Sequence, residues 1–310
     1  MQACGPRQGG LGLAVSGGPD SLALLLLAHE ALPDGFEVAT VDHGLRPESA
    51  GEAAKVAELC AARDIAHAAL RAQVARRGNL HANARDARYA ALAGWADARG
   101  LCAIVTAHHL DDQAETLLMR LNRGAAVRGL AGMRRTTVIP DGRGERRLAL
   151  WRPLLGWRRA ELAAVVAAAG WTPADDPSNR DSRFDRTAAR ALLAANPWLD
   201  PVALAQSAAH LGEADEAIEA AAAQAWDDHV VEDGEALLYD ARSPRAVELR
   251  VIEWILAALG SEGQPRGSEI ARLHRTLANC GTATLAGVRA SAGPAGPPWR
   301  FVRAPPRRSR

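Results

Sequence analysis

The sequence predicts an α/β protein: a doubly wound, mostly parallel sheet with a smaller helical C-terminal domain. Over the first half of the 310 residues, short apolar runs alternate with helical patterns. Repeated strand–helix pairs are typical of a parallel sheet that is covered by helices on both faces. After Asn196-Pro197 the pattern changes to long helical stretches. We therefore expect one domain over residues 1–196 and a reduced, helical second domain over residues 197–310.

Each element of this fold has its own local signal. Apolar runs bounded by turn residues predict five strands, at Leu11–Val15, Phe36–Val41, Ile65–Leu70, Leu101–Thr106 and Leu148–Trp151. Helical periodicity predicts the helices between and after them, at Asp20–His29, Pro47–Ala62, Ala82–Ala98, Leu110–Leu121, Trp157–Ala169, Val202–Trp226 and Ser243–Leu259. A looser connection rich in Arg and Gly spans Gly124–Arg147. The end, Ser291–Arg310, is rich in Pro and Arg, and we expect part of it to be disordered.

The formal net charge of +1 conceals a strong asymmetry along the chain. Arg120–Arg159 contains 11 Arg and two acidic residues, and Ile270–Arg310 contains eight Arg and no acidic residue. Pro197–Ala241, in contrast, has 11 acidic residues and no Lys or Arg. Basic clusters suit a phosphate backbone, although a compositional preference for Arg over Lys is an equal alternative on charge alone.

Several classes of protein are excluded by composition. A hydrophobic content of 48% argues against wholesale disorder, and the longest apolar run, Ser21–Ala28, is far too short to span a membrane. The four cysteines lie far apart without a CxxC pair, which argues against a disulfide framework, a zinc knuckle or a cysteine-held iron–sulfur cluster. We expect a cytoplasmic protein without membrane contact. Whether it forms a homodimer stays open.

A glycine-rich hexapeptide between the first strand and the first helix is the strongest chemical signal. Glycines let a phosphate approach the backbone, and the N–H groups at a helix N-terminus point at the anion. The Lys-Ser/Thr ending of kinase and GTPase P-loops is missing, so no lysine clamps a γ-phosphate. A plain strand–helix turn is the alternative. The candidate phosphate-binding residues are Ser16, Gly17, Gly18, Pro19, Asp20 and Ser21.

A second signal follows the strand Leu101–Thr106, where five ionisable residues lie within eight positions. On a helix, His108, Asp112 and Glu115 would lie at i, i+4 and i+7, in one stripe. Histidine with carboxylates is able to hold a divalent metal, orient a cationic substrate or transfer protons. The alternative is an ordinary helix start, where acidic residues complement the helix dipole.

Ligands of doubly wound sheets bind at the carboxyl ends of the strands, and this rule brings three segments to one rim. They are Ser16–Ser21, Asp42–Arg46 and His108–Glu115. Weaker signals are a helix face with Arg85, Arg88 and Tyr89, and a basic stripe of Arg180, Arg183, Arg186 and Arg190. For the first, a core tyrosine beside two solvated arginines is the default explanation, and for the second a charged helix face is the commoner one.

Six segments between Leu13 and Leu193, in the right order, resemble the tRNA(Ile)-lysidine synthetase family of N-type ATP pyrophosphatases. They are SGGPDS, VDHGLRPES, ARDARY, TAHHLDDQAETLLMRLNRGAAVRGLAGM, RPLL and DDPSNRD. The resemblance implies an adenine nucleotide alpha-hydrolase-like catalytic domain over residues 1–196. Because little chain follows Asn196, the sequence resembles the short form of the family, with a helical linker and a reduced tRNA-binding domain with a basic tail.

The resemblance also implies a reaction. ATP, with Mg²⁺, would adenylate the C2 oxygen of the first anticodon cytidine of tRNA(Ile) with a CAU anticodon, and free L-lysine would then displace AMP. ATP contacts would come from Ser16–Ser21, Asp42 and His43, with Asp20 placing Mg²⁺. The catalytic residues would be His108, Arg88, Asp112 and Glu115, the last two binding lysine, and tRNA contacts would come from Arg46, Arg123, Arg128 and Arg180. The alternatives are another tRNA-modifying synthetase that splits ATP, and a tRNA-binding relative without turnover.

Overall fold

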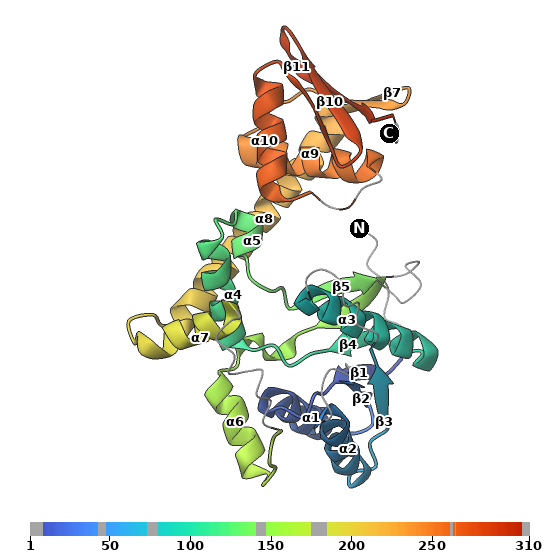
Figure 1. Ribbon diagram of the computed structural model, residues 1–310, viewed down its shortest axis with the longest axis vertical. Helices are drawn as coiled ribbons and strands as arrows, with labels where there is room; N and C mark the ends of the chain where they lie inside the picture. Colours follow the sequence, from blue (N-terminus) through green and yellow to red (C-terminus); the bar gives the residue numbers. More distant parts are fainter. Residues whose placement is uncertain are drawn as a thin grey trace. The chain divides into compact units, whose positions relative to one another are not determined.

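The computed structural model describes residues 9–42, 48–72, 80–140, 147–174, 185–260, 263 and 265–305. The chain divides into two compact units, which Figure 1 shows in sequence colours. The first unit comprises Met1–Met119 with Gly132–Ala208, and the second comprises Arg120–Ala131 with Ala209–Arg310. Helices α4 (Leu110–Asn122) and α8 (Pro201–His229) contribute residues to both units.

The first unit is built on a six-stranded sheet in the order β3-β2-β1-β4-β6-β5. All neighbouring strands are parallel except β5 and β6, which are antiparallel. The chain runs from β1 to β2 and β3 on one side and then crosses to β4 on the other side of β1. The strands are β1 (Leu11–Ala14), β2 (Phe36–Asp42), β3 (His67–Arg71), β4 (Ala103–Val105), β5 (Thr136–Pro140) and β6 (Arg147–Trp151).

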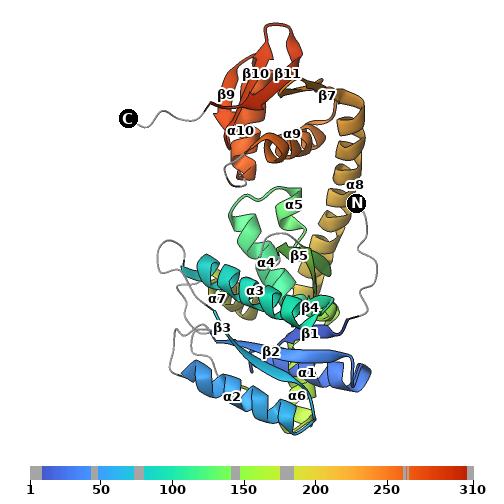
Figure 2. The ribbon, with the colours of Figure 1, turned by 90° about the vertical axis from the view of Figure 1, so that its right-hand side faces the viewer.

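Helices cover both faces of this sheet, as the sequence predicts. Alternate residues of β1 point to opposite sides, so that Leu13 packs into a core with α1, α2 and α6, whereas Ala14 packs into a core with α3. Figure 2, turned from the view of Figure 1, shows α3 on one side of the sheet and α2 and α6 on the other. The helices are α1 (Pro19–Ala31), α2 (Glu48–Ala61), α3 (Leu80–Arg99), α6 (Arg159–Ala168) and α7 (Asp185–Ala195), with a 3-10 turn at Pro153–Gly156.

The connection after α4 is more regular than expected. It contains the short helix α5 (Val127–Leu130) and the edge strand β5, which pairs with β6 from Thr136 opposite Trp151 to Pro140 opposite Arg147. The run of β-branched residues in β5 favours a strand, and the proline at its end is tolerated at a sheet edge. This strand was not predicted from the sequence, which favoured a looser connection here.

The second unit is not purely helical, which corrects the sequence-based prediction. Beside α9 (Arg245–Leu259) and α10 (Gly267–Ala278) it contains a five-stranded antiparallel sheet in the order β7-β8-β11-β10-β9. The last strand lies inside the segment expected to be partly disordered, and its Trp299 and Phe301 are buried in the core of this unit. The strands are β7 (Val230–Asp233), β8 (Ala236–Tyr239), β9 (Thr282–Leu285), β10 (Val288–Gly293) and β11 (Gly296–Arg303).

Within the described residues, no helix is both long enough and apolar enough to cross a membrane.

Candidate active site

The candidate site lies at the carboxyl ends of β1 and β4, the neighbouring strands between which the direction of winding changes. Ligands of open α/β sheets bind at this kind of switch point. The segment after β1 is the Ser16–Ser21 loop, and the segment after β4 is Thr106–His109. Residues from both segments line one cavity of about 190 Å³, as expected for segments that follow neighbouring parallel strands.

The Ser16–Ser21 loop is fixed by its own hydrogen bonds. The Ser21 hydroxyl donates to the Gly18 carbonyl (2.9 Å) and accepts from the Ser16 backbone N–H (3.1 Å). Gly17 has a φ of 87°, which favours glycine, and no side chain caps the start of α1. A Cβ on Gly18 would meet nothing nearer than Ser16 Oγ at 3.8 Å. The loop thus leaves space and uncapped N–H groups at the N-terminus of α1, which suits a phosphate.

The cavity is cationic. Its described lining residues include three arginines (Arg88, Arg159 and Arg190) and one carboxylate, that of Asp20. Its neutral lining comes from Ala14, Ser16, Gly18, Pro19, Ser21, Thr106, Ala107 and His108. Gly17 and Asp42 are not part of this lining; Asp42 ends β2. The balance of charge favours a polyanionic ligand.

His108 lies just before α4 and therefore does not share a helical stripe with Asp112 and Glu115, contrary to the prediction. Its Nδ1 is 2.9 Å from the Thr106 hydroxyl. Burial, assisted by the nearby positive charges of Arg152 and Arg88, lowers the pKa of His108 to about 2. The imidazole is consequently neutral at physiological pH, and it contributes hydrogen bonds rather than charge.

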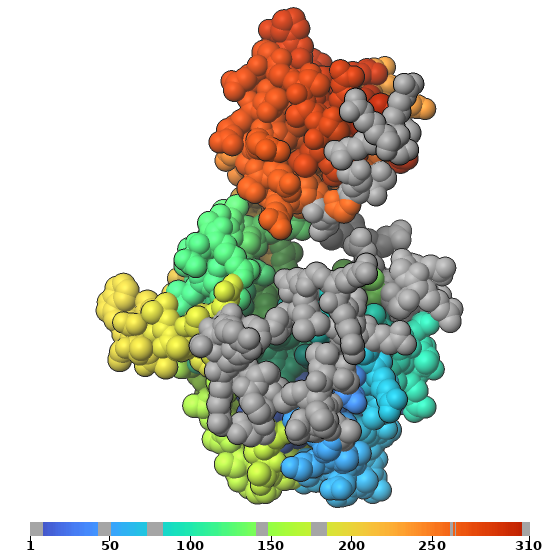
Figure 3. Space-filling model, in the orientation of Figure 1, coloured from blue at the N-terminus to red at the C-terminus, as the bar shows by residue number. Residues whose placement is uncertain are grey.

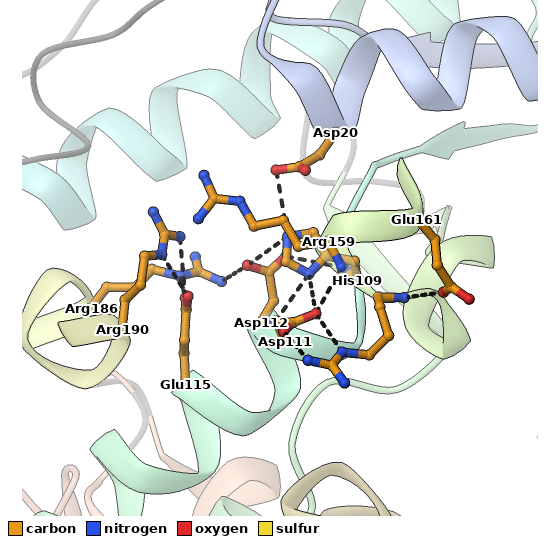
Figure 4. Close-up of polar contacts among 10 residues, drawn as sticks. Asp20, His109, Asp111, Asp112, Glu115, Arg159, Glu161, Arg186 and Arg190 are labelled. Carbon is orange, nitrogen blue, oxygen red and sulfur yellow. Dashed lines mark hydrogen bonds and ion pairs between the residues drawn. The ribbon is translucent and has the colours of Figure 1, made fainter. Parts of the chain in front are cut away.

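Asp112 and Glu115 form a buried carboxylate pair on α4, with 8% and 2% of their surfaces exposed. Arg186 of α7 bridges them: its Nη2 lies 2.8 Å from Asp112 Oδ1 and its Nε 2.9 Å from Glu115 Oε2. Arg190, one turn further along α7, donates to Glu115 Oε1 at 2.8 Å. Figure 4 shows both arginines reaching the pair from α7, and Figure 3 shows this helix (yellow) at the surface of the first unit. Burial raises the pKa of Asp112, although Arg186 and His109 oppose the shift.

His109 connects the loop to this carboxylate pair, and the sequence reasoning did not select it. Its ring is 1% exposed, and its Nε2 lies 3.4 Å from Asp20 Oδ2 and 3.6 Å from Asp112 Oδ1. Burial opposes a charge on this imidazole, but the hydrogen bond to Asp20 and the charges of Asp112 and Asp111 outweigh burial and raise its pKa. The sequence signal for this residue was the pair of adjacent histidines, His108 and His109. The sequence does not show which of the two rings contacts Asp20 and Asp112, because that depends on the direction of each ring in the fold.

Two further α4 residues position the surrounding segments. Asp111 accepts the Arg159 backbone N–H (2.8 Å) and the Arg158 guanidinium (3.2 Å), and it thereby fixes the start of α6. Gln113 exchanges two hydrogen bonds with the Met133 backbone, at 2.6 and 2.8 Å. The motifs HHLDDQAE and RGLAGM are therefore in direct contact.

The remaining predicted residues are distributed as follows. Arg88 lines the cavity, and its Cζ lies 6.0 Å from the centre of the Tyr89 ring. Arg123 and Arg128 are exposed residues of the second unit, and Arg128 donates to Glu253 at 2.8 Å. Four of the residues named from the sequence lie outside the described part of the chain, namely His43, Arg46, Arg180 and Arg183.

Comparison with known proteins places the chain in a family. A model of the PP-loop domain matches residues 3–196. A tRNA(Ile)-lysidine synthase of Novosphingobium aromaticivorans is 53% identical over 96% of this chain and 90% of its own length. A second, from Zymomonas mobilis, is 42% identical over 98% of this chain and 91% of its own length.

Among solved structures, that of the U34-tRNA thiolase NcsA from Methanococcus maripaludis with its [4Fe-4S] cluster has a similar fold. The TM-score is 0.54 with 15% sequence identity, over 67% of this chain and 74% of the thiolase. Together with the match to residues 3–196, these relatives show that the chain belongs to the PP-loop proteins and, among them, to the tRNA(Ile)-lysidine synthase family.

Proposed function

We propose that the protein uses ATP to join the side-chain amine of lysine to C2 of the cytidine at the first anticodon position of tRNA(Ile) with a CAU anticodon, forming lysidine. The observation that carries the proposal is a juxtaposition within the first unit. A cationic cavity on the Ser16–Ser21 loop is linked by His109 to the buried carboxylates of Asp112 and Glu115. The full-length similarity to relatives named tRNA(Ile)-lysidine synthase supports the same reaction.

The triphosphate of ATP would bind the Ser16–Ser21 loop, where Gly18 leaves room and the start of α1 is uncapped. Asp20 suits a magnesium ion, because its buried Oδ1 lacks a hydrogen-bond partner within the described structure while its Oδ2 faces His109. Mg²⁺ is usually held by one or two carboxylates together with substrate phosphates. When bound there, the ion would neutralise charge on the departing phosphates.

In the first step, the C2 oxygen of the cytidine bonds to the α-phosphorus of ATP, and pyrophosphate leaves. Arg88 and His108 line the cavity in which this charge develops. In the tautomer in which Nδ1 accepts the Thr106 hydroxyl proton, the neutral His108 ring would carry its own proton on Nε2 and would donate it as a hydrogen bond. Both residues would stabilise the negative charge without transferring a proton.

In the second step, the side-chain amine of lysine attacks C2, and AMP leaves. Ionised carboxylates are suitable partners for an ammonium group, so Asp112 and Glu115 would bind the lysine side chain. The amine must lose a proton before it attacks, and Asp112, whose pKa is raised by burial, is suited to accept it. Lysine would share these carboxylates with Arg186 and Arg190 or displace them.

Contacts with the tRNA backbone are proposed for Arg123 and Arg128, and for Arg46 and Arg180. Arginines bind phosphates with little dependence on sequence. Specificity for the anticodon cytidine would come from stacking and edge contacts on unpaired bases.

The proposal is tested with the full chain, ATP labelled at its α-phosphate and a CAU-anticodon tRNA(Ile) transcript. We expect labelled AMP only when the transcript and lysine are both present. AMP release without lysine incorporation would assign another substrate to the same ATP chemistry. Tight tRNA binding without ATP cleavage would indicate the non-catalytic alternative.

A further inference from the structure

We infer that the guanidinium of Arg159 binds the pyrophosphate leaving group. Arg159 lines the same cavity as the Ser16–Ser21 loop, and Figure 4 shows its side chain extending from the start of α6 past Asp20. The inference rests on the proposed function for the identity of the leaving group. It adds a residue from α6 to a phosphate site that the sequence placed on the loop alone.

The side chains of Arg158 and Arg159 differ in their contacts. The Arg158 guanidinium donates to both carboxylate oxygens of Asp111, at 3.2 and 3.3 Å, so its charge is neutralised. The backbone N–H of Arg159 donates to the same carboxylate at 2.8 Å, and the Arg158 backbone N–H donates to Glu161 at 2.6 Å. These bonds fix the first turn of α6, and they leave the Arg159 side chain directed into the cavity.

The other two arginines of the cavity are already engaged. Arg190 donates to Glu115 at 2.8 Å, and Arg88 lies against the Tyr89 ring and close enough to His108 to lower the pKa of that imidazole. Within the described residues, in contrast, the hydrogen bond of Arg159 involves its backbone N–H, and its guanidinium has no hydrogen bond or ion pair. An arginine that lines a cavity without a carboxylate partner is suited to an anionic ligand.

The chemistry of the first step supplies such an anion. As the C2 oxygen bonds to the α-phosphorus, the bond between that phosphorus and the bridging oxygen breaks, and its electron pair remains on the pyrophosphate. The forked N–H donors of Arg159 would bind this oxygen and its neighbours without losing a proton. Arg159 would thus supply the fixed cation that the loop lacks, because the loop has no P-loop lysine.

The test compares the affinities of the full-length protein for inorganic pyrophosphate and for AMP, measured by calorimetry at constant Mg²⁺ without tRNA or lysine. We expect Arg159→Gln to weaken pyrophosphate binding about 10- to 100-fold, because this is the loss of affinity expected when one hydrogen bond from a charged donor is removed. AMP binding should be nearly unchanged. Arg159→Lys should give an intermediate value. Arg99→Gln is the matched control, because Arg99 is an exposed arginine of the same unit paired with Glu37.

Unchanged pyrophosphate affinity in Arg159→Gln would overturn the inference, as would an equal loss of pyrophosphate and AMP binding or a wild-type protein that binds no pyrophosphate. If Arg159→Gln does not fold, the Arg159→Lys affinities decide in the same way. A wild-type protein that binds pyrophosphate through Arg159 but incorporates no lysine would refute the proposed function and leave this inference standing.

Discussion

The guanidinium of Arg186 lies 2.9 Å from the buried carboxylate of Glu115, although 71 residues separate them in the sequence. The same guanidinium reaches Asp112, so that one arginine of α7 pairs with both carboxylates proposed to bind lysine. A charge left alone at either position would be costly, because both carboxylates are buried. Entry of lysine at this proposed site would therefore be coupled to the ion pairs between α7 and α4.

The first prediction concerns the carboxylates themselves. We expect Glu115→Gln and Asp112→Asn each to raise the KM for lysine about tenfold or more, because a charged hydrogen-bond acceptor is lost. Steady-state kinetics with varied lysine measure this change. Glu37→Gln, which alters a partly exposed carboxylate of the same unit that pairs with Arg99, should leave the KM unchanged. A wild-type KM and turnover in both site variants would refute the assignment.

The second prediction concerns Arg186. Arg186→Gln leaves two buried carboxylates short of a cation, and we expect the free energy of unfolding to fall by about 2 kcal/mol, a modest value because Arg186 is partly exposed. Since the ammonium of lysine would then replace the missing charge, lysine should raise the melting temperature of the variant more than that of the wild type. Equal stabilisation of the two proteins by lysine would argue against a shared site.

The third prediction separates folding from binding at adjacent glycines. Gly17→Ala places a Cβ on a backbone with a φ of 87°, and we expect it to destabilise the protein by about 1–2 kcal/mol. Gly18→Ala is unstrained and meets no atom nearer than 3.8 Å, so the fold should be retained. Its methyl group, however, enters the cavity and should weaken ATP binding. Chemical denaturation and nucleotide titration measure the two effects, and an equal affinity of Gly18→Ala and wild type for ATP would contradict the loop assignment.

The fourth prediction concerns pH. Burial and the neighbouring arginines lower the pKa of His108 to about 2, whereas the unfolded chain binds a proton near the ordinary value of about 6.5. The contribution of His108 to the free energy of unfolding is fully present at pH values above the pKa of this residue in the unfolded chain. It is lost as the pH falls toward the pKa in the folded protein, at up to about 1.4 kcal/mol per pH unit. His108→Gln should therefore flatten the decline in unfolding free energy between about pH 6.5 and 5.

The control for this pH series is His210→Gln, because His210 is exposed on α8. Urea denaturation at each pH gives the slopes, and we expect the control to keep the wild-type slope. A wild-type slope in His108→Gln would mean that His108 binds a proton in the folded protein, and its assignment as a neutral hydrogen-bond donor would then be wrong.

The sequence predicts the parallel sheet and the rim of the first unit because their signals are local. Buried parallel strands are continuous apolar runs, and the winding rule then brings the Ser16–Ser21 loop to His108. The pairing of Arg186 with Glu115 was not predictable in this way. Arginines every three or four residues are equally typical of a solvated helix face, and only the tertiary packing of α7 on α4 distinguishes the two cases.

The second unit shows a different reason for failure. Its last strand, β11, has two prolines directly after its first residue and lies near a run of arginines, which is the composition of a disordered tail. The alternation that specifies a strand is nevertheless present, since Trp299 and Phe301 are buried and Arg300 between them is exposed. A period-two pattern over so few residues is a weaker signal than this composition, and β8, one of the two antiparallel partners of β11, lies about 60 residues earlier in the sequence.

The most direct test of the central claim is incorporation of labelled lysine into the CAU-anticodon tRNA(Ile) transcript in the presence of ATP, with the modified nucleotide located by nuclease digestion. The proposed function predicts one lysine at the first anticodon position, and none in a matched transcript with uridine at that position. Label at any other position, or equal label in both transcripts, would contradict lysidine formation by this protein.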